Sequence, residues 1–214
     1  MIQAVIFDMD GVIVDSEPYQ FLAFQDLFQE YGVKLTRENF NGVGRTAKEN
    51  IELLMKKWRI QGDLLQLSEK REEIYRRLIK NNVKPMKGAI RLINRLGFSC
   101  KLAVASSSIR KNIDFILTSL KLKGKFDAVV GGDEVKNGKP APDIFIAAAA
   151  KLKVKPSACV VIEDAERGVA AAKAAKMFCI AVPNKYTLGH NFSEADLVVS
   201  SLEEINSETI KKLH

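Results

Sequence analysis

Two aspartates near the N-terminus, Asp8 and Asp10, are the residues of this sequence that most directly suggest chemistry. They follow the apolar run 4–7 and precede Gly11. A run that is apolar at successive positions is typical of a strand buried on both faces, as in a parallel sheet. Catalytic groups and ligands gather at the carboxyl ends of such strands. We therefore expect Asp8 at the end of a buried strand and Asp10 in the turn beyond it, where Gly11 permits a sharp bend.

The two carboxylates repel each other unless a positive charge lies beside them, and a divalent metal ion is the obvious candidate. The same residues also allow a simpler interpretation, because Asp-Gly is a common turn sequence. A short motif is only a hypothesis. The decision between a site and a turn depends on the rest of the chain.

Further polar residues stand where predicted strands end or where a loop enters a helix. They are Ser106 and Ser107 after the run 101–105, Glu163 and Asp164 after the run 159–162, and Lys139 in the turn-rich loop 136–143. If the strands are parallel neighbours, these groups meet at one edge of the sheet. Singly, each has a structural explanation as a helix cap, a helix-start acid or an exposed loop lysine. Their joint placement indicates a site.

This set of groups suits phosphoryl transfer through an aspartyl-phosphate. Magnesium is typically held by one or two carboxylates and by substrate phosphate. Asp8 and Asp164 could supply those carboxylates, with Glu163 acting directly or through water. Lys139 and Ser106 would hold phosphate oxygens, helped by backbone N–H groups at the following helix N-termini.

The order of the predicted elements indicates an α/β fold with a parallel sheet and helices on both faces. Short apolar strands at 101–105, 128–130, 159–162, 178–182 and 197–199 alternate with helical patterns. Residues 16–85 have helical spacing throughout and no convincing strand. We therefore expect an all-helical unit at 16–85, inserted into a core formed by residues 1–15 and 86–214.

The inserted unit begins with Ser16, a plausible N-cap, and Pro18, which suits an early helical position. Its apolar residues fall into helical stripes, which indicate packing and no chemistry. The stripes include Ile51, Leu54, Met55 and Trp58, and then Ile74, Leu78 and Ile79. The loop Asn41-Gly42-Val43-Gly44-Arg45 interrupts the pattern and presents one guanidinium, which can bind phosphate as a planar fork. An exposed surface arginine is the competing interpretation.

Composition places the chain among globular proteins. Of its 214 residues, 47% are hydrophobic and 28% charged, and the formal net charge is +7. The basic excess is spread along the chain without a basic run and interleaved aromatics, so we expect a small anionic substrate and no nucleic acid. We also expect no membrane span and no signal peptide. The chain has an odd number of cysteines, and they are widely spaced: Cys100, Cys159 and Cys179. This pattern indicates buried free thiols in a reducing cytoplasm.

Four motifs resemble those of the haloacid dehalogenase superfamily of phosphohydrolases, in the subfamily with a helical cap after the first motif. They are Asp8-Met9-Asp10-Gly11-Val12, Ser106 after Ala103-Val104-Ala105, Lys139 in Gly138-Lys139-Pro140-Ala141-Pro142-Asp143, and Glu163-Asp164 before Ala165-Glu166-Arg167-Gly168. The resemblance covers the whole chain and is strongest to the beta-phosphoglucomutase-like group and its sugar-phosphate phosphatase relatives. It implies a Rossmann-like core at 1–15 and 86–214 and a cap at 16–85.

The resemblance implies that Asp8 is the nucleophile and Asp10 the general acid and base. Ser106, Ser107 and Lys139 would bind phosphate. The implied Mg²⁺ ligands are Asp8, Asp10, Glu163 and Asp164. The cap would close over the substrate and choose it, and Arg45 matches the cap-loop arginine that holds the distal phosphate in the mutase.

One departure from the mutase favours a phosphatase. The mutase carries a histidine on the first cap helix, where this chain has Gln20, and that histidine is thought to help delay hydrolysis. Phosphatase is therefore the expected activity, on a small phosphorylated metabolite such as a sugar phosphate, with beta-phosphoglucomutase as the alternative. We expect a cytoplasmic monomer.

Two further classes fit less well. The namesake dehalogenases lack the second aspartate and need no metal, so Asp10, Glu163 and Asp164 argue against that activity. A non-catalytic binding module would be expected to lose the nucleophile or a metal-binding acid, and here every catalytic position is filled.

Overall fold

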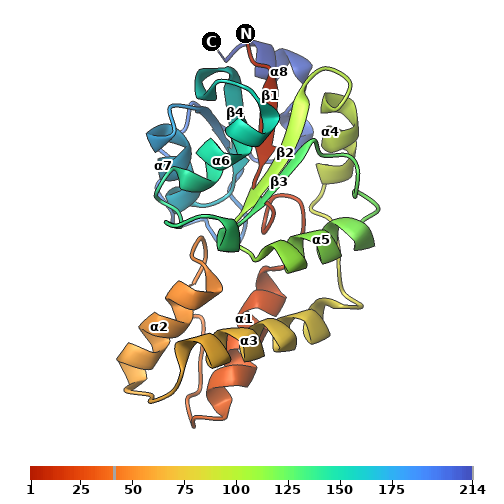
Figure 1. Ribbon diagram of the computed structural model, residues 1–214. Helices are drawn as coiled ribbons and strands as arrows, with labels where there is room; N and C mark the ends of the chain where they lie inside the picture. The colour runs from red at the N-terminus through yellow and green to blue at the C-terminus, as the bar shows by residue number, and fades with distance from the viewer. Residues whose placement is uncertain (41, 214) are drawn as a thin grey trace.

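A parallel six-stranded sheet forms the centre of the computed structural model, which describes residues 1–40 and 42–213 (Figure 1). The strand order is β3-β2-β1-β4-β5-β6. The strands are β1 (Ala4–Phe7), β2 (Lys101–Ser106), β3 (Ala128–Gly131), β4 (Cys159–Glu163), β5 (Phe178–Ala181) and β6 (Leu197–Val198). This arrangement confirms the predicted α/β fold.

The register of the central strands determines which polar residues meet. Phe7 of β1 pairs with Val104 of β2 on one side and with Ile162 of β4 on the other. Asp8 therefore leaves the sheet beside the ends of β2 and β4, where Ser106 and Glu163 lie. The prediction that these strand ends are neighbours is confirmed.

Helices cover both faces of the sheet. They are α4 (Ala89–Leu96), α5 (Arg110–Ser119), α6 (Asp143–Leu152), α7 (Glu166–Ala174) and α8 (Ser207–Lys211). Alternate residues of β1 point to opposite faces, as expected for a strand. Val5 and Phe7 pack with apolar residues of α4 and α5, whereas Ala4 and Ile6 pack with residues of α6 and α7.

Three helices between the first two strands form a separate layer at the carboxyl edge of the sheet (Figure 1). They are α1 (Glu17–Gln29), α2 (Ala47–Trp58) and α3 (Leu64–Ile79), and α1 packs against α3. The predicted apolar stripes supply the buried side chains Ile51, Leu54, Ile74 and Ile79 of this layer. Asn41, in the predicted arginine loop, lies outside the described residues.

The start of α1 differs from the expectation in one respect. Ser16 occupies the N-cap position and Pro18 the first turn, as predicted. The Ser16 hydroxyl, however, does not cap the helix. It donates instead to Asp10 Oδ1 at 2.5 Å, so a residue expected to act locally contributes to the site.

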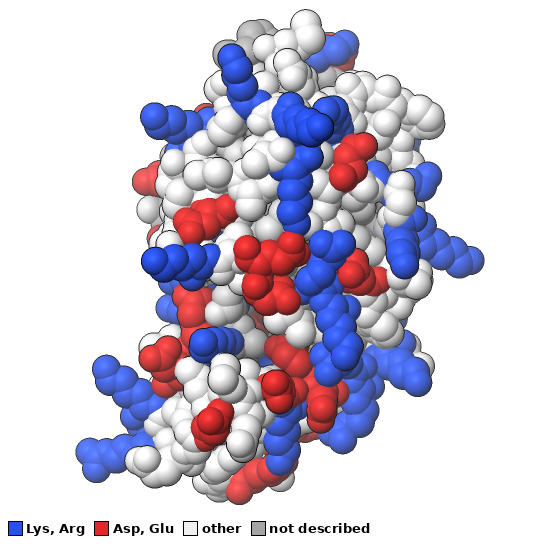
Figure 2. All heavy atoms as spheres, in the orientation of Figure 1, with Lys and Arg blue, Asp and Glu red and all other residues white. Residues whose placement is uncertain are grey.

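The cysteines agree with the expectation of buried free thiols only in part. Cys159 and Cys179 are buried, but Cys100 is only half-buried, because it precedes β2 and is not within it; all three thiols are free. Within residues 1–40 and 42–213, no helix has both the length and the apolar character needed to cross a membrane. Figure 2 shows Lys and Arg side chains dispersed over the drawn face, with Asp and Glu side chains among them.

Candidate active site

A cavity of about 960 Å³ lies between the carboxyl edge of the sheet and the three-helix layer. Its lining contains all but one of the predicted site residues: Asp8, Asp10, Gln20, Arg45, Ser107, Lys139, Glu163 and Asp164. The exception is Ser106, which is completely buried and whose hydroxyl donates to Asp10 Oδ2 at 3.1 Å. The chain thus gathers these residues from positions up to 156 apart in sequence into one space.

Lys139 lies between two carboxylates at the sheet edge. Its Nζ is 2.5 Å from Asp8 Oδ1 and 2.6 Å from Glu163 Oε1, and its side chain is only 2% exposed. The two carboxylates raise the pKa of Lys139 above its usual range, although burial by itself would lower it. The lysine is therefore a fixed cation, suited to stabilising the charge of a phosphoryl group.

Asp8 is held in a setting that disfavours its ionised form. Burial raises its pKa to about 8, and the charges of Glu163 and Asp10 add to this, while Lys139 opposes it. The group is buried with the acids Glu163 and Asp164 beside a single cation, Lys139. Such an excess of negative charge favours either protonation or the binding of another cation.

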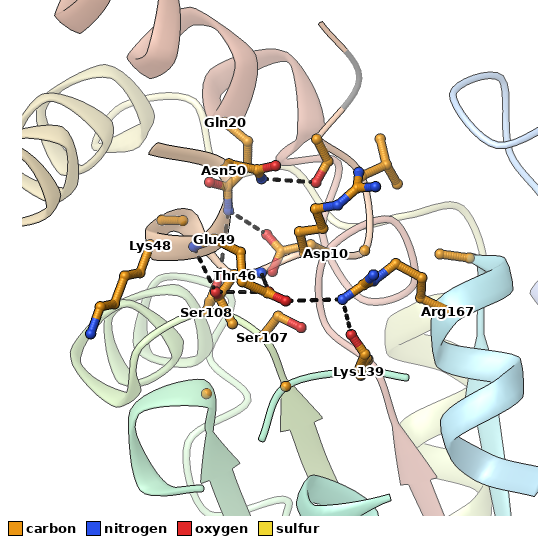
Figure 3. Close-up of a pocket in the computed structure, with 18 of the residues that line it drawn as sticks. Asp10, Gln20, Thr46, Lys48, Glu49, Asn50, Ser107, Ser108, Lys139 and Arg167 are labelled. Carbon is orange, nitrogen blue, oxygen red and sulfur yellow. Dashed lines mark hydrogen bonds and ion pairs between the residues drawn. The ribbon is translucent and has the colours of Figure 1, made fainter. Parts of the chain in front are cut away.

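Asp10 is surrounded by hydrogen-bond donors from both layers. Oδ1 accepts from Ser16 and from Gln20 Nε2 at 2.9 Å, and Oδ2 accepts from Ser106 and from the Ser108 hydroxyl at 2.9 Å. Figure 3 shows Gln20 and Ser108 beside Asp10. Three of these donors are hydroxyl groups, which can also accept. Asp10 can therefore lose or gain a proton while keeping its partners, as a general acid and base must.

Glu163 is engaged on both of its oxygens. Oε1 binds Lys139, while Oε2 accepts from the backbone N–H groups of Asp164 and Ala165 at 2.7 and 2.8 Å. Gly168 lies so close that a Cβ atom there would collide with the Glu163 carboxylate. The structure therefore shows Glu163 positioning Lys139, and its role as a metal ligand stays a prediction.

Asp164 faces the turn that carries Asp10. Its Oδ2 accepts from Asn184 Nδ2 at 2.7 Å, and a Cβ atom on Gly11 would collide with this carboxylate. Gly11 also has a φ of +83°, a conformation that favours glycine. Burial raises the pKa of Asp164 well above its usual range, and the negative charges of Glu163 and Asp8 raise it further.

A metal ion fits part of the predicted ligand set. No three acids, histidines or cysteines form a preformed metal cage within the described ranges 1–40 and 42–213. Asp8 and Asp164 nevertheless line the cavity together, and the buried acids exceed the one buried lysine by two charges. Two carboxylates completed by phosphate and water are a usual magnesium site. The Asp10 carboxylate accepts from three serines and Gln20, and its role as a metal ligand stays a prediction.

The helical layer contributes Gln20 and Arg45 to the cavity. Gln20 is itself held by Arg71, whose Nη2 donates to the Gln20 backbone oxygen at 3.0 Å and also to its side-chain oxygen. Arg71 is only 2% exposed and lies over the ring of Phe24, with 4.3 Å from the guanidinium carbon to the ring centroid. Because Arg71 binds the side-chain oxygen of Gln20, the amide N–H of Gln20 faces Asp10.

Several residues of the site were not predicted from the sequence. Asn184 follows β5 by three residues, so the strand-end rule that found Asp8 and Glu163 would also have found it. Ser108 is adjacent to the predicted serines. Arg71 gave no signal, because a charged residue in a helix is normally exposed. Its guanidinium lies over the ring of Phe24, which belongs to another helix, α1.

Comparison with known proteins agrees with this geometry. A family model described as haloacid dehalogenase-like hydrolase matches residues 5–182. A phosphorylated carbohydrates phosphatase of Thermotoga maritima is 35% identical over 178 residues, covering 81% of each chain. A beta-phosphoglucomutase of Bacillus subtilis is 33% identical over 219 residues, covering 97% of this chain and 93% of its own. The crystal structure of CbbY from Rhodobacter sphaeroides in complex with phosphate superposes with a TM-score of 0.90 at 27% identity, covering 99% of this chain and 100% of its own.

Proposed function

The chain belongs to the haloacid dehalogenase-like hydrolase family and is a phosphoric monoester hydrolase, and from this premise we propose that it is a magnesium-dependent phosphatase of a small phosphorylated metabolite, best matched by a sugar phosphate. The observation that carries the proposal is the position of Lys139 between Asp8 and Glu163, in the cavity that Asp10 also lines. The name of the Thermotoga relative supports a carbohydrate substrate. Residues 1–15 and 86–214 would form the catalytic core and residues 16–85 the cap.

In the first half of the proposed reaction, a carboxylate oxygen of Asp8 attacks the phosphorus atom. The bond from phosphorus to the ester oxygen breaks as the new bond forms, and Asp10 gives its proton to the departing oxygen. Lys139 is already in contact with Asp8, so its charge is in place without rearrangement. Ser107 lines the cavity and would contribute phosphate hydrogen bonds.

In the second half, water cleaves the aspartyl-phosphate. Asp10, now ionised, takes a proton from that water while the water oxygen attacks phosphorus. The bond to Asp8 breaks, inorganic phosphate leaves and Asp8 is restored. A magnesium ion held by Asp8 and Asp164 would neutralise part of the phosphoryl charge.

The experiment that tests this function is phosphate release with Mg²⁺ across a panel of phosphorylated metabolites. The panel includes beta-glucose 1-phosphate, assayed with and without a bisphosphate primer. We expect free phosphate from one or a few sugar phosphates. Primer-dependent formation of glucose 6-phosphate with little free phosphate would instead identify a beta-phosphoglucomutase, and would show that Gln20 does not separate the two activities.

Removing magnesium should abolish turnover, and the affinity for Mg²⁺ should depend on pH. Magnesium needs the ionised carboxylate, whereas burial raises the pKa of Asp8 to about 8. The apparent affinity should therefore fall by about 10-fold for each pH unit below 8, if one proton is displaced. Calorimetric titration at pH 6, 7 and 8 checks this. Undiminished activity in EDTA would contradict the metal assignment, and Asp8→Asn should make the pH dependence flatter.

Gln20→Ala should lower kcat by about 10-fold, because Asp10 loses one of the donors that orient it. The matched control is Gln25→Ala on the same helix, where the amide donates to the Leu35 carbonyl oxygen at 2.7 Å and does not reach Asp10. Steady-state kinetics on the best substrate of the panel compare the two. Equal losses of kcat in both variants would mean that Gln20 acts only through the stability of the cap.

A further inference from the structure

The two chain crossings between core and cap lie side by side. The N–H of Asp15 donates to the Lys84 carbonyl oxygen at 3.0 Å, and the N–H of Met86 donates to the Ile13 carbonyl oxygen at 2.9 Å. Close to them, Asn112 of α5 donates to Glu72 of α3 and accepts from Arg76 Nη1 at 3.3 Å. Glu72 and Asn112 are buried, so this side of the cap is a fixed connection.

The opposite side of the cap meets the core through a different kind of contact. There the loop before α2 reaches the edge of the core (Figure 1). Arg167 Nη2, in the first turn of α7, lies 3.0 Å from Glu49 Oε1 of α2. The two side chains are 29% and 39% exposed, respectively. A partly exposed ion pair shifts an equilibrium by a few-fold, which suits a contact that must form and break.

Glu49 is built rigidly into the cap. Its other oxygen, Oε2, accepts from the backbone N–H and the hydroxyl of Thr46 at 2.7 and 2.9 Å, and Thr46 Oγ1 in turn caps α2. This capping box fixes the carboxylate relative to the helix. Arg167 therefore holds the whole first turn of α2 and the loop that carries Arg45.

Arg167 also reaches the catalytic lysine loop. The same Nη2 donates to the backbone oxygen of Lys139, as Figure 3 shows. The lysine loop also lies close to the start of α2: a Cβ atom on Gly138 would lie 3.4 Å from side-chain atoms of Glu49 and Thr46. The guanidinium of Arg167 thus links the cap to the backbone of Lys139, the residue whose side chain contacts Asp8 and Glu163.

We propose that Arg167 is a positioning residue that joins cap closure to the placement of Lys139, with Glu49 as its partner on the cap. This inference rests on the proposed phosphatase function. In the closed arrangement the guanidinium is shared between the cap carboxylate and the Lys139 carbonyl oxygen. The cap then turns on the buried Glu72–Asn112 side and is held by the Glu49–Arg167 pair across the cavity.

The test compares two substrates in three variants. Glu49→Gln retains a capping amide but removes the ion pair, Arg167→Met removes both contacts of the guanidinium, and Arg167→Lys restores a cation. The substrates are the best metabolite of the panel and p-nitrophenyl phosphate, which offers no hydroxyl groups to the cap. The control is Glu30→Gln, which removes an ion pair with Lys70 that lies entirely within the cap.

For Glu49→Gln, kcat/KM on the metabolite should fall by about 5-fold, mainly through KM, with less than about 2-fold change on p-nitrophenyl phosphate. Arg167→Met should lower kcat on both substrates by about 10-fold, because Lys139 loses its support. Arg167→Lys should recover part of that loss. The double variant Glu49→Gln with Arg167→Met should be no worse than Arg167→Met alone.

Amide hydrogen exchange of residues 42–50 without substrate gives a readout that is independent of activity. Exchange should be about 3- to 5-fold faster in Glu49→Gln and Arg167→Met than in the unmodified protein, and unchanged in Glu30→Gln. Additive losses of activity, or exchange rates equal to those of Glu30→Gln, would overturn the proposal. If no member of the panel released phosphate, the proposed function would fail, and the exchange rates would still decide whether the contact holds the cap.

Discussion

Asp8→Asn is expected to lower phosphate release by about 10⁴-fold or more, because an amide cannot form the aspartyl-phosphate. The fold should remain intact, since asparagine has the same shape and its side-chain oxygen can still accept from Lys139. Phosphate release with Mg²⁺ on the best substrate of the panel measures the effect. Asp63→Asn is the control, because Asp63 is an exposed N-cap of α3 and asparagine caps helices equally well.

The same variant should change stability in a direction set by pH. The pKa of Asp8 is about 8 in the folded protein and about 3.8 when the chain is unfolded. Folding therefore favours the protonated form, so the unmodified metal-free protein loses stability as the pH rises from about 4 to 8. Asp8→Asn lacks this loss, and in EDTA its melting temperature should exceed that of the unmodified protein by more at pH 8 than at pH 5. Turnover retained by Asp8→Asn would contradict the nucleophile assignment. A melting temperature of Asp8→Asn below that of the unmodified protein at pH 8 would contradict the argument that burial disfavours the ionised carboxylate.

Lys139→Met should cost about 3–5 kcal/mol of unfolding free energy at pH 8, in addition to abolishing turnover. Lys139 is 2% exposed and contacts both Asp8 and Glu163, so its removal leaves two buried carboxylates without a cation. Lowering the pH protonates Asp8, because burial raises its pKa to about 8, and this should shrink the loss of stability. Urea unfolding in EDTA at pH 8 and pH 5 measures the difference between the two conditions.

The control for this variant is Lys111→Met, an exposed lysine on α5, which should change stability by less than about 0.5 kcal/mol. Adding Mg²⁺ to Lys139→Met should restore part of the stability, since a cation again lies beside Asp8. An equal loss at pH 5 and pH 8 would show that packing of the lysine stem, and not charge, explains the effect.

Much of the core could be predicted from the sequence because each strand is an apolar run that stops at a polar residue. In a parallel sheet all strands end at the same edge, so local composition already places Asp8, Ser106 and Glu163 together. The same rule extends to Asn184, which was overlooked. The helical character of 16–85 was also evident, since apolar residues at helical spacing appear directly in the sequence.

The individual hydrogen bonds of the site were less predictable. Ser16 has the type and position of an N-cap, yet its hydroxyl binds Asp10, because that carboxylate lies within reach once the turn at Gly11 is formed. Ser106 was expected to hold phosphate, and its hydroxyl faces Asp10 in this structure. A hydroxyl can satisfy either partner, and only the arrangement of neighbouring groups selects one.

The sequence by itself determined the residue types at the strand ends, and with them the chemistry, because strand length and side-chain identity are local properties. Tertiary structure alone decided which distant groups meet. Glu49 and Arg167 are 118 positions apart, and neither lies in a pattern that predicts a partner. Arg71 is buried with its guanidinium over the ring of Phe24, a residue 47 positions earlier on another helix. The Glu49–Arg167 contact depends on how the helical layer sits on the sheet, and the Arg71–Phe24 contact depends on how α3 packs against α1. Each placement is the sum of many weak interactions that no single stretch of sequence encodes.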